Sequence, residues 1–213
     1  MEGEGKGDLQ SSVEGRGLVI EVRIHGRGGQ GAVIASKVLA AAVFKEGRYV
    51  QSFPSFGVER RGAPVAAFTR IDDKPVRLRC QIYNPDHVMV LDPSLMQVVD
   101  VLAGLKEGGW ILINSEQPPA AFKLPLSFRV ATVDANAIAI KYRLGPRTAP
   151  IVNTAILGAF ARVTGIVSLE AVTEAVRDAV PVKREANVAA TREAYEAVKV
   201  LQLVRPARVA VVS

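Results

Sequence analysis

The segment with the clearest chemical potential is a glycine-rich loop, Gly26-Arg27-Gly28-Gly29-Gln30-Gly31, which fits the pattern G-x-G-x-x-G. It follows a β-rich apolar run at 18–24 and precedes an alanine-rich run of helical length at 32–46. Glycines lack a Cβ atom, so backbone N–H groups can approach an anion, and the N-terminus of the next helix adds positive potential. The loop is therefore competent to hold a phosphate group.

Two other interpretations of this loop stay open. A nicotinamide dinucleotide site usually has an acidic residue about 20 positions after the glycines, but the sequence there reads Tyr-Val-Gln-Ser at 49–52. The glycines can instead serve only to pack the helix tightly on the sheet. The side-chain amide of Gln30 suits a hydrogen bond to a ligand carbonyl, and it equally suits a tie within the loop.

A second chemistry-bearing segment reads F-P-S-F-G-V-E-R-R-G-A-P-V at 53–65. Its prolines stiffen the chain, and Glu59, Arg60 and Arg61 place charge on it. Loops of this kind are typical of binding sites and interfaces, although a surface loop with a local Glu–Arg pair explains the pattern equally well. Arginine suits such a position because its planar guanidinium matches carboxylates and phosphates.

The sequence contains few residues that could bind a metal ion or take part in redox chemistry. The single cysteine, Cys80, excludes an internal disulfide, and one thiol cannot hold an iron–sulfur cluster or build a zinc site. We interpret Cys80 as a small half-buried hydrophobic residue. The two histidines, His25 and His87, are interpreted as packed residues at strand ends. We therefore predict no catalytic residue and no metal site in this chain.

Composition and charge limit the class of protein to which the chain can belong. The 213 residues are 49% apolar and 23% charged, with a net charge of +6. We predict a flexible leader at 1–17 and a single domain at 18–213. No apolar run is long enough to cross a membrane and the leader lacks an apolar signal core, so we expect a cytoplasmic protein without a membrane partner. Basic residues are mixed with acids and few aromatics, which predicts no nucleic-acid partner.

The elements that position these residues alternate between strands and helices. This alternation predicts an α/β, Rossmann-like fold with a mainly parallel sheet flanked by helices and a C-terminal helical segment. Strands are expected at 18–24, 49–53, 64–71, 76–82 (as a hairpin partner), 87–91, 110–113 and 128–133. Helices are expected at 32–46, 95–105, 134–142, 151–163, 168–178 and 183–203.

Ligands of such sheets bind beyond the carboxyl ends of the strands. The residues expected at that edge are Gly26 to Gln30, Asp92, Asn114, Ser115 and Asp134. The run 151–163 is apolar nearly all round, so it should be buried in the domain or against a partner.

The two loops together are similar to those of the gamma subunits of 2-oxoacid:ferredoxin oxidoreductases, of the pyruvate or 2-ketoisovalerate type. Further similarity is carried by Tyr83-Asn84-Pro85-Asp86, by Val90-Leu91-Asp92 and by the run 153–159. The resemblance extends over roughly 18–201. One departure is Val58, where the family often has proline, which makes the loop less rigid and leaves its charges in place.

The resemblance implies a complex that decarboxylates a 2-oxoacid, with pyruvate the first choice, to acyl-CoA and CO2 while reducing ferredoxin. It implies thiamine diphosphate, magnesium and iron–sulfur clusters on partner alpha, beta and delta subunits, with CoA as co-substrate and ferredoxin as acceptor. This chain would bind none of these cofactors itself and would be inactive alone. It would dock on the cofactor-bearing subunits and contribute to the CoA side.

Two sets of site residues follow from the loops. The expected cofactor-binding positions are Gly26, Gly28, Gly29, Gln30 and Gly31. The expected interface or ligand positions are Glu59, Arg60 and Arg61. The alternative function is a stand-alone nucleotide-binding Rossmann-like protein that uses the glycine loop.

Overall fold

The computed structural model describes residues 19–55, 62–78 and 80–201. The leader predicted at 1–17 lies outside these residues, so both it and the single-domain assignment of 18–213 stay predictions. In chain order the elements are β1 (Ile20–Arg27), α1 (Ala32–Lys45), β2 (Tyr49–Pro54), β3 (Pro64–Asp72), β4 (His87–Val90), the 3-10 helix η1 (Pro93–Gln97), β5 (Trp110–Asn114), the 3-10 helix η2 (Pro119–Phe122), β6 (Arg129–Val133), α2 (Ala135–Lys141), α3 (Ala155–Thr164), α4 (Leu169–Ala179), α5 (Arg184–Ala197) and β7 (Lys199–Val200).

The strands of the described residues form one seven-stranded sheet in the order β2-β3-β1-β4-β5-β6-β7. At its centre β1, β4, β5 and β6 run parallel, which confirms the predicted α/β fold class. The edges differ, because β3 runs antiparallel to both β1 and β2, and β7 runs antiparallel to β6. A short connection between β2 and β3 permits only the antiparallel arrangement, whereas each parallel pair needs a crossover.

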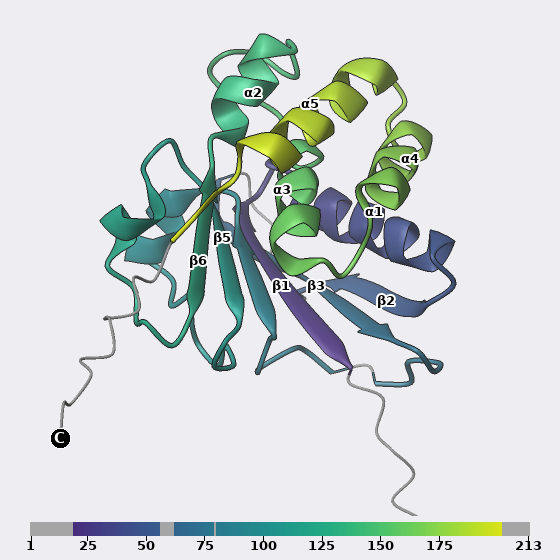
Figure 1. The fold of residues 1–213 in the computed structure, drawn as a ribbon, viewed down its shortest axis with the longest axis vertical. Coiled ribbons are helices and arrows are strands. Elements are labelled where there is room, and N and C mark those ends of the chain that lie inside the picture. Colours follow the sequence, from purple (N-terminus) through teal and green to yellow (C-terminus); the bar gives the residue numbers. More distant parts are fainter. Residues whose placement is uncertain (1–18, 56–61, 79, 202–213) are drawn as a thin grey trace, which may run out of the picture.

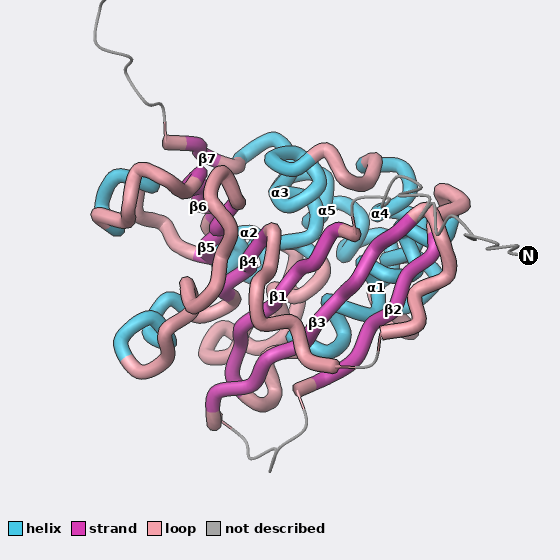
Figure 2. The backbone as a smooth tube through the Cα atoms, turned by 90° about the horizontal axis from the view of Figure 1, so that it is seen from below, coloured by secondary structure: helices cyan, strands magenta, loops and turns pink. Residues whose placement is uncertain are grey.

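The helices gather over one face of the sheet (Figure 1). α1 and α3 lie directly on the strands, and α4 and α5 pack against them. The larger hydrophobic core fills this layer, and Val22, Ile24 and Leu112 point into it from the sheet. The view from below shows the helices behind the strands β1, β3 and β2 (Figure 2).

Irregular segments and the two 3-10 helices cover the opposite face, where Val88, Val90, Ile111 and Ile113 form a second core. The prediction of a helix at 95–105 is wrong, because only η1 and a series of turns are present there. Hydrogen bonds that compete with a helix explain the difference: the buried Arg23 guanidinium donates to Val101 O and Ala103 O at 3.1 and 2.7 Å.

The predicted hairpin strand at 76–82 is also absent from the described residues of that run. Arg70, whose side chain is 2% exposed, donates to Leu78 O and Gln81 O and forms an ion pair with Glu21 at 2.7 Å. The carbonyl groups that a strand would offer to its neighbour are therefore bound by one buried guanidinium, and the segment folds over the sheet as coil.

The apolar run around α3 is buried inside the domain. Residues 155–161 are all buried, so α3 is an interior helix and its own chain covers it. A Cβ atom on Gly158 would lie 1.9 Å from Thr191 O of α5, so the close crossing of the two helices requires glycine. The helix predicted at 183–203 ends at Ala197, because Lys199 and Val200 pair with β6 instead. No helix among the described residues has the length and apolar character to cross a membrane.

Candidate functional site

The connections of the sheet reverse direction between β1 and β4. After β1 the chain forms α1 on the helical face and proceeds to β2 and β3 on one side. After β4 it crosses the opposite face, through the second core, to β5 on the other side. Such a reversal opens a crevice at the carboxyl ends of the neighbouring parallel strands, where ligands bind. The glycine loop begins in the last two residues of β1, and Asp92 follows β4, so both border this crevice.

Packing explains two of the loop glycines. Gly26 lies within β1, where a Cβ atom would lie 3.2 Å from both Ala32 Cβ and Leu91 Cδ1. Gly31 begins α1 with a φ of +84°, and a Cβ atom there would lie 2.3 Å from Asn153 Nδ2. Packing therefore requires glycine at Gly31 and leaves little room for a side chain at Gly26, and the ligand-binding role of both stays a prediction.

The other two glycines differ in their surroundings. Gly28 forms two backbone hydrogen bonds with the segment that enters β3: its N–H donates to Ala63 O at 2.9 Å, and its carbonyl accepts from Gly62 N–H at 3.0 Å. Gly29 has a φ of +96°, and a Cβ atom there would meet nothing within 4 Å. Gly29 therefore has open space beside its backbone.

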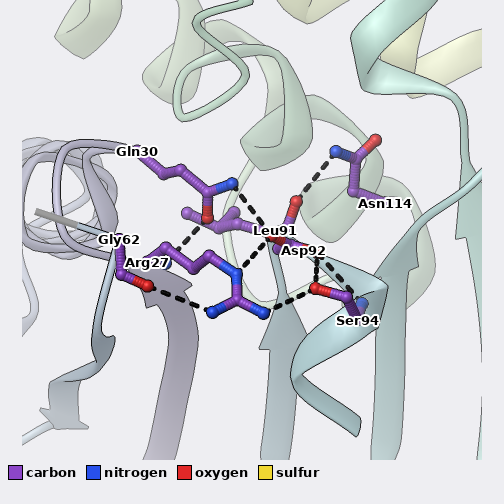
Figure 3. Close-up of polar contacts among 7 residues, drawn as sticks. All are labelled: Arg27, Gln30, Gly62, Leu91, Asp92, Ser94 and Asn114. Atoms are coloured by element: carbon purple, nitrogen blue, oxygen red, sulfur yellow. Dashed lines mark hydrogen bonds and ion pairs between the residues drawn. The ribbon is translucent and has the colours of Figure 1, made fainter. Parts of the chain in front are cut away.

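Gln30 ties the loop together (Figure 3). Its Oε1 accepts from Arg27 N–H at 2.7 Å, and its Nε2 donates to Asp92 Oδ2 at 3.3 Å. The sequence left two roles open for this amide, a hydrogen bond to a ligand and a hydrogen bond within the loop. In the structure it forms the hydrogen bond within the loop. The amide holds β1 and β4 together at the point where the crevice begins.

Arg27 and Asp92 form the centre of the same network (Figure 3). Arg27 Nε lies 2.8 Å from Asp92 Oδ2, while its two terminal nitrogens donate to Gly62 O at 3.1 Å and Ser94 Oγ at 2.7 Å. One guanidinium thus joins the glycine loop, the start of β3 and η1. Because three segments share it, the network fixes the shape of the loop beside Gly29.

The carboxylate of Asp92 is held in its charged form. Partial burial alone raises the pKa of Asp92, but hydrogen bonds from the Ser94 hydroxyl and backbone N–H, together with Arg27, outweigh that effect. The net result is a pKa below the ordinary value. A charged Asp92 keeps Arg27 in place at neutral pH, which makes Arg27 a structural cation of the loop.

A cavity of about 700 Å³ lies in the crevice, which is large enough for part of a sizeable ligand. Gly28, Gly29 and Gln30 line one side, and the segment 147–152 lines the other. A smaller hollow of about 230 Å³ lies at the N-terminus of α1. A third hollow of about 490 Å³ continues along the strand ends and shares Pro93, Asn136 and Ile140 with the main cavity.

Two charged residues line the main cavity, and one of them, Asp92, is already paired with Arg27. Arg147 lines it with an exposed cationic side chain. The cap position of α1, Gly31, has no side chain, so the N–H groups of the first turn lack a side-chain partner and add positive potential near Gly29. The arrangement is suited to binding phosphate or carboxylate groups of a ligand. The described residues around it contain no nucleophile–base pair.

The prediction for the strand ends is confirmed in its placement. Asn114 is buried, and its amide donates to Leu91 O at 2.9 Å while its Oδ1 accepts from Ala135 N–H at 3.0 Å. Asp134 caps α2 through Ala137 N–H, and Ser115 lines the third hollow. These side chains therefore support the edge, and Asn114 in particular joins β4 to α2.

The charged loop residues Glu59, Arg60 and Arg61 lie outside the described residues, so their role stays a prediction. Sequence reasoning did not foresee two features of the site. Arg27 was expected at this edge as part of the glycine loop, but its pairing with Asp92 depends on strand order. Arg147 follows Gly145-Pro146, a break in the pattern that indicates a loop and says nothing of its destination.

Both histidines are packed, as predicted. His25 is 7% exposed and its Nε2 accepts from Arg23 Nε at 3.0 Å, while burial and then the charge of Arg23 lower its pKa to about 4. Burial likewise lowers the pKa of His87 to about 4, and its Nδ1 accepts from Trp110 N–H.

Cys80 departs from expectation, because its side chain is exposed rather than half-buried. It lies 3.6 Å from Arg70 Nη2 on the surface of the coil that follows β3. Among the residues that the structure describes, no group of three or more His, Cys, Asp or Glu side chains is arranged to hold a metal ion.

Comparison with known proteins identifies close relatives. A family model described as pyruvate ferredoxin/flavodoxin oxidoreductase matches residues 21–197. The "Pyruvate/ketoisovalerate oxidoreductases common subunit gamma" of Thermococcus litoralis is 54% identical over 189 residues, covering 87% of this chain and 100% of the relative. The "Pyruvate synthase subunit PorC" of Methanothermobacter marburgensis is 52% identical over 182 residues, covering 85% and 98%. The crystal structure of pyruvate oxidoreductase subunit PORC from Thermotoga maritima superposes with a TM-score of 0.74 at 39% identity, covering 86% and 99%.

Proposed function

The chain belongs to the pyruvate ferredoxin/flavodoxin oxidoreductase family, and from this premise we propose how it acts as the gamma subunit of a 2-oxoacid:ferredoxin oxidoreductase. The reaction converts a 2-oxoacid, CoA and two oxidised ferredoxins into acyl-CoA, CO2, a proton and two reduced ferredoxins. The proposed 2-oxoacid is pyruvate, because the relatives that cover most of the chain carry pyruvate in their names.

The chemistry-bearing cofactors belong on other subunits. An iron–sulfur cluster is held by cysteine thiolates, usually four, and the chain has one cysteine. Magnesium bound with thiamine diphosphate needs oxygen ligands gathered at one place, and the described acidic residues form no such group. We therefore assign thiamine diphosphate, magnesium and the clusters to the alpha, beta and delta subunits, and ferredoxin to the assembled complex.

The contribution of this chain is the CoA side of the active site. CoA carries phosphate groups. The main cavity beside Gly29 offers the cation Arg147, and the smaller hollow that also borders Gly29 offers the positive N-terminal end of α1. The observation that carries this proposal is the Arg27–Asp92–Gln30 network, which fixes the glycine loop without using Gly29. A rigid loop beside an open cavity lowers the entropic cost of binding an anion there.

Reconstitution tests the subunit function. We expect the purified chain to reduce no viologen dye from pyruvate and CoA, and we expect the remaining subunits to lose activity without it and regain activity when it is added. Dye reduction by the isolated chain, or full activity of the complex without it, would refute the proposed function. The same experiment excludes the stand-alone nucleotide-binding alternative, which is disfavoured because the relatives named above are subunits.

Substitution of Arg147 tests the CoA assignment. Arg147→Ala removes an exposed cation, so the fold should be unaffected. In the reconstituted complex we expect the KM for CoA to rise about tenfold, the equivalent of one lost charge-assisted contact, with the KM for pyruvate unchanged. Lys74→Ala, an exposed residue in the turn after β3 at the opposite edge of the sheet, is the control. Equal CoA kinetics for the two variants would contradict the assignment.

Glu59, Arg60 and Arg61 are assigned to ion pairs with a partner subunit or with the ligand, from the sequence alone. Arg60→Ala separates these two possibilities. Weaker assembly with an unchanged KM for CoA would support the interface, whereas normal assembly with a raised KM would support ligand contact. A variant equal to the wild type in both measurements would remove Arg60 from the site. The cytoplasmic location and the absence of a nucleic-acid partner stay predictions.

A further inference from the structure

We propose that an apolar groove next to the candidate cavity is the docking site for an apolar segment of another subunit that carries acidic residues on its flanks. The groove has a volume of about 350 Å³ and lies between the N-terminus of α1, the segment 144–154 and the turn between α4 and α5. This inference rests on the proposed function, since it identifies where the gamma subunit contacts its complex.

The groove is lined by hydrophobic side chains that remain open to solvent in the isolated chain. Ile34, Ile151 and Val182 are 52%, 46% and 68% exposed, and they converge on the groove from three separate segments. Leu144 and Val180 complete its floor. Exposed apolar residues are common singly, but a concave cluster drawn from three segments is typical of an interaction site.

Basic residues outnumber acidic ones on the segments that border the groove. Lys183 lines the groove, Arg184 follows it, Arg143 and Arg147 flank the loop that contains Gly145, and Lys37 lies one turn along α1 from Ile34. All of these side chains are exposed, and none forms an ion pair with an acid of the described residues. The acidic side chains nearest in sequence, Asp178 and Glu185, are already paired with Lys45 and Arg177. The unpaired charge around the groove is therefore positive.

The positive charge around the groove favours one kind of binding partner over another. A second copy of the chain, related by a two-fold axis, would place the same basic rim against itself, which is repulsive. A segment with apolar side chains in the centre and Asp or Glu on both sides matches both properties of the groove. Opposite charge at the edge of an interface accelerates association and fixes its register.

The groove is held in shape before any partner arrives. Lys183 Nζ donates to Arg143 O at 2.6 Å, which ties the turn before α5 to the end of α2. Thr154 Oγ1 donates to Asn187 Oδ1 at 2.7 Å beneath the groove. Ile151 lines both the groove and the main cavity, so a segment bound in the groove would close one wall of the proposed CoA site.

The test measures association of the full chain with the remaining subunits of its complex. Val182→Glu places a carboxylate on the apolar surface opposite the acidic flanks, and we expect the dissociation constant to rise at least about tenfold. Arg184→Glu should weaken association several-fold and reduce its dependence on salt. The controls are Leu126→Glu, a residue 73% exposed after η2, and Lys74→Glu, both of which should associate like the wild type.

Cross-linking identifies the occupant. A Cys80→Ala, Val182→Cys chain labelled with benzophenone should cross-link, in the active complex, to an apolar peptide of another subunit with acidic residues on both sides. A cross-link to a second gamma chain, or to a peptide without acidic flanks, would overturn the proposal. So would wild-type association by Val182→Glu. Failure of the wild-type chain to associate at all would instead refute the proposed function, and the docking site with it.

Discussion

The network at the start of the glycine loop makes a quantitative prediction for Asp92→Asn. Asp92 is 20% exposed at its side chain, and it accepts from Arg27 at 2.8 Å and from the Ser94 hydroxyl and N–H at 2.6 and 3.0 Å. Asparagine retains the shape and one acceptor oxygen, but it presents no charge to Arg27. A charge-assisted hydrogen bond contributes about 1.5–3 kcal/mol, so we expect a loss of about 2 kcal/mol in the free energy of unfolding.

Thermal unfolding of the isolated chain measures this loss. For a protein of this size, 2 kcal/mol lowers the Tm by roughly 4–8 °C. The matched control is Asp73→Asn, whose ion pair with Arg48 has a carboxylate that is 74% exposed and should contribute less than about 0.5 kcal/mol. A double-mutant cycle with Arg27→Met should give a coupling energy of about 1–2 kcal/mol. If Asp92→Asn lowered the Tm no more than Asp73→Asn, the network would not hold the loop.

Two further predictions concern the domain that supports the site. Gly158→Ala would place a Cβ atom 1.9 Å from Thr191 O and would force α3 away from α5. We expect the free energy of unfolding, measured with urea, to fall by about 3 kcal/mol. A urea midpoint equal to that of the wild type would contradict the close crossing of the two helices. Burial, the larger cause, lowers the pKa of both His25 and His87 to about 4, below the unfolded value, so the unfolded chain binds more protons at mildly acidic pH. Stability should therefore be complete above about pH 6.5 and fall as the pH drops toward 4, by up to roughly 3 kcal/mol for each histidine. His87→Gln should flatten this decline, and urea midpoints that are equal at pH 7 and pH 5 would refute it.

The central part of the fold was predictable because local patterns and tertiary structure agree there. An apolar strand, a glycine break and an alanine-rich run predicted β1, the loop and α1, and the helices expected from 134 and 168 begin where Asp134 and Ser168 cap α2 and α4. The residues placed at the carboxyl ends of the strands do meet at one edge. Strand order within the sheet is what brings Asp92 beside the glycine loop.

Two of the errors, the helix predicted at 95–105 and the strand predicted at 76–82, have a common physical origin in buried arginines. Arg23 binds the carbonyl groups of 101 and 103, and Arg70 binds those of 78 and 81. In each case a side chain from another segment satisfies backbone groups that local propensity assigns to a helix or a strand. The partners of Arg23 lie 78 and 80 residues away, and those of Arg70 lie 8 and 11 residues away on the segment that follows β3. The place of Arg147 beside the cavity was missed because it depends on where the loop after α2 lies, which no local pattern shows.

The most direct test of the account compares two glycines in the reconstituted complex. Gly29 and Gly47 have φ values of +96° and +79°, and a Cβ atom at either position meets nothing within 4 Å, so alanine should strain both by a similar amount, about 1–2 kcal/mol. Only Gly29 borders the cavity; Gly47 follows the far end of α1. We predict that Gly29→Ala raises the KM for CoA about tenfold while Gly47→Ala leaves it unchanged, with the KM for pyruvate constant in both. An identical KM for CoA in the two variants would contradict the assignment of the glycine loop to the CoA side.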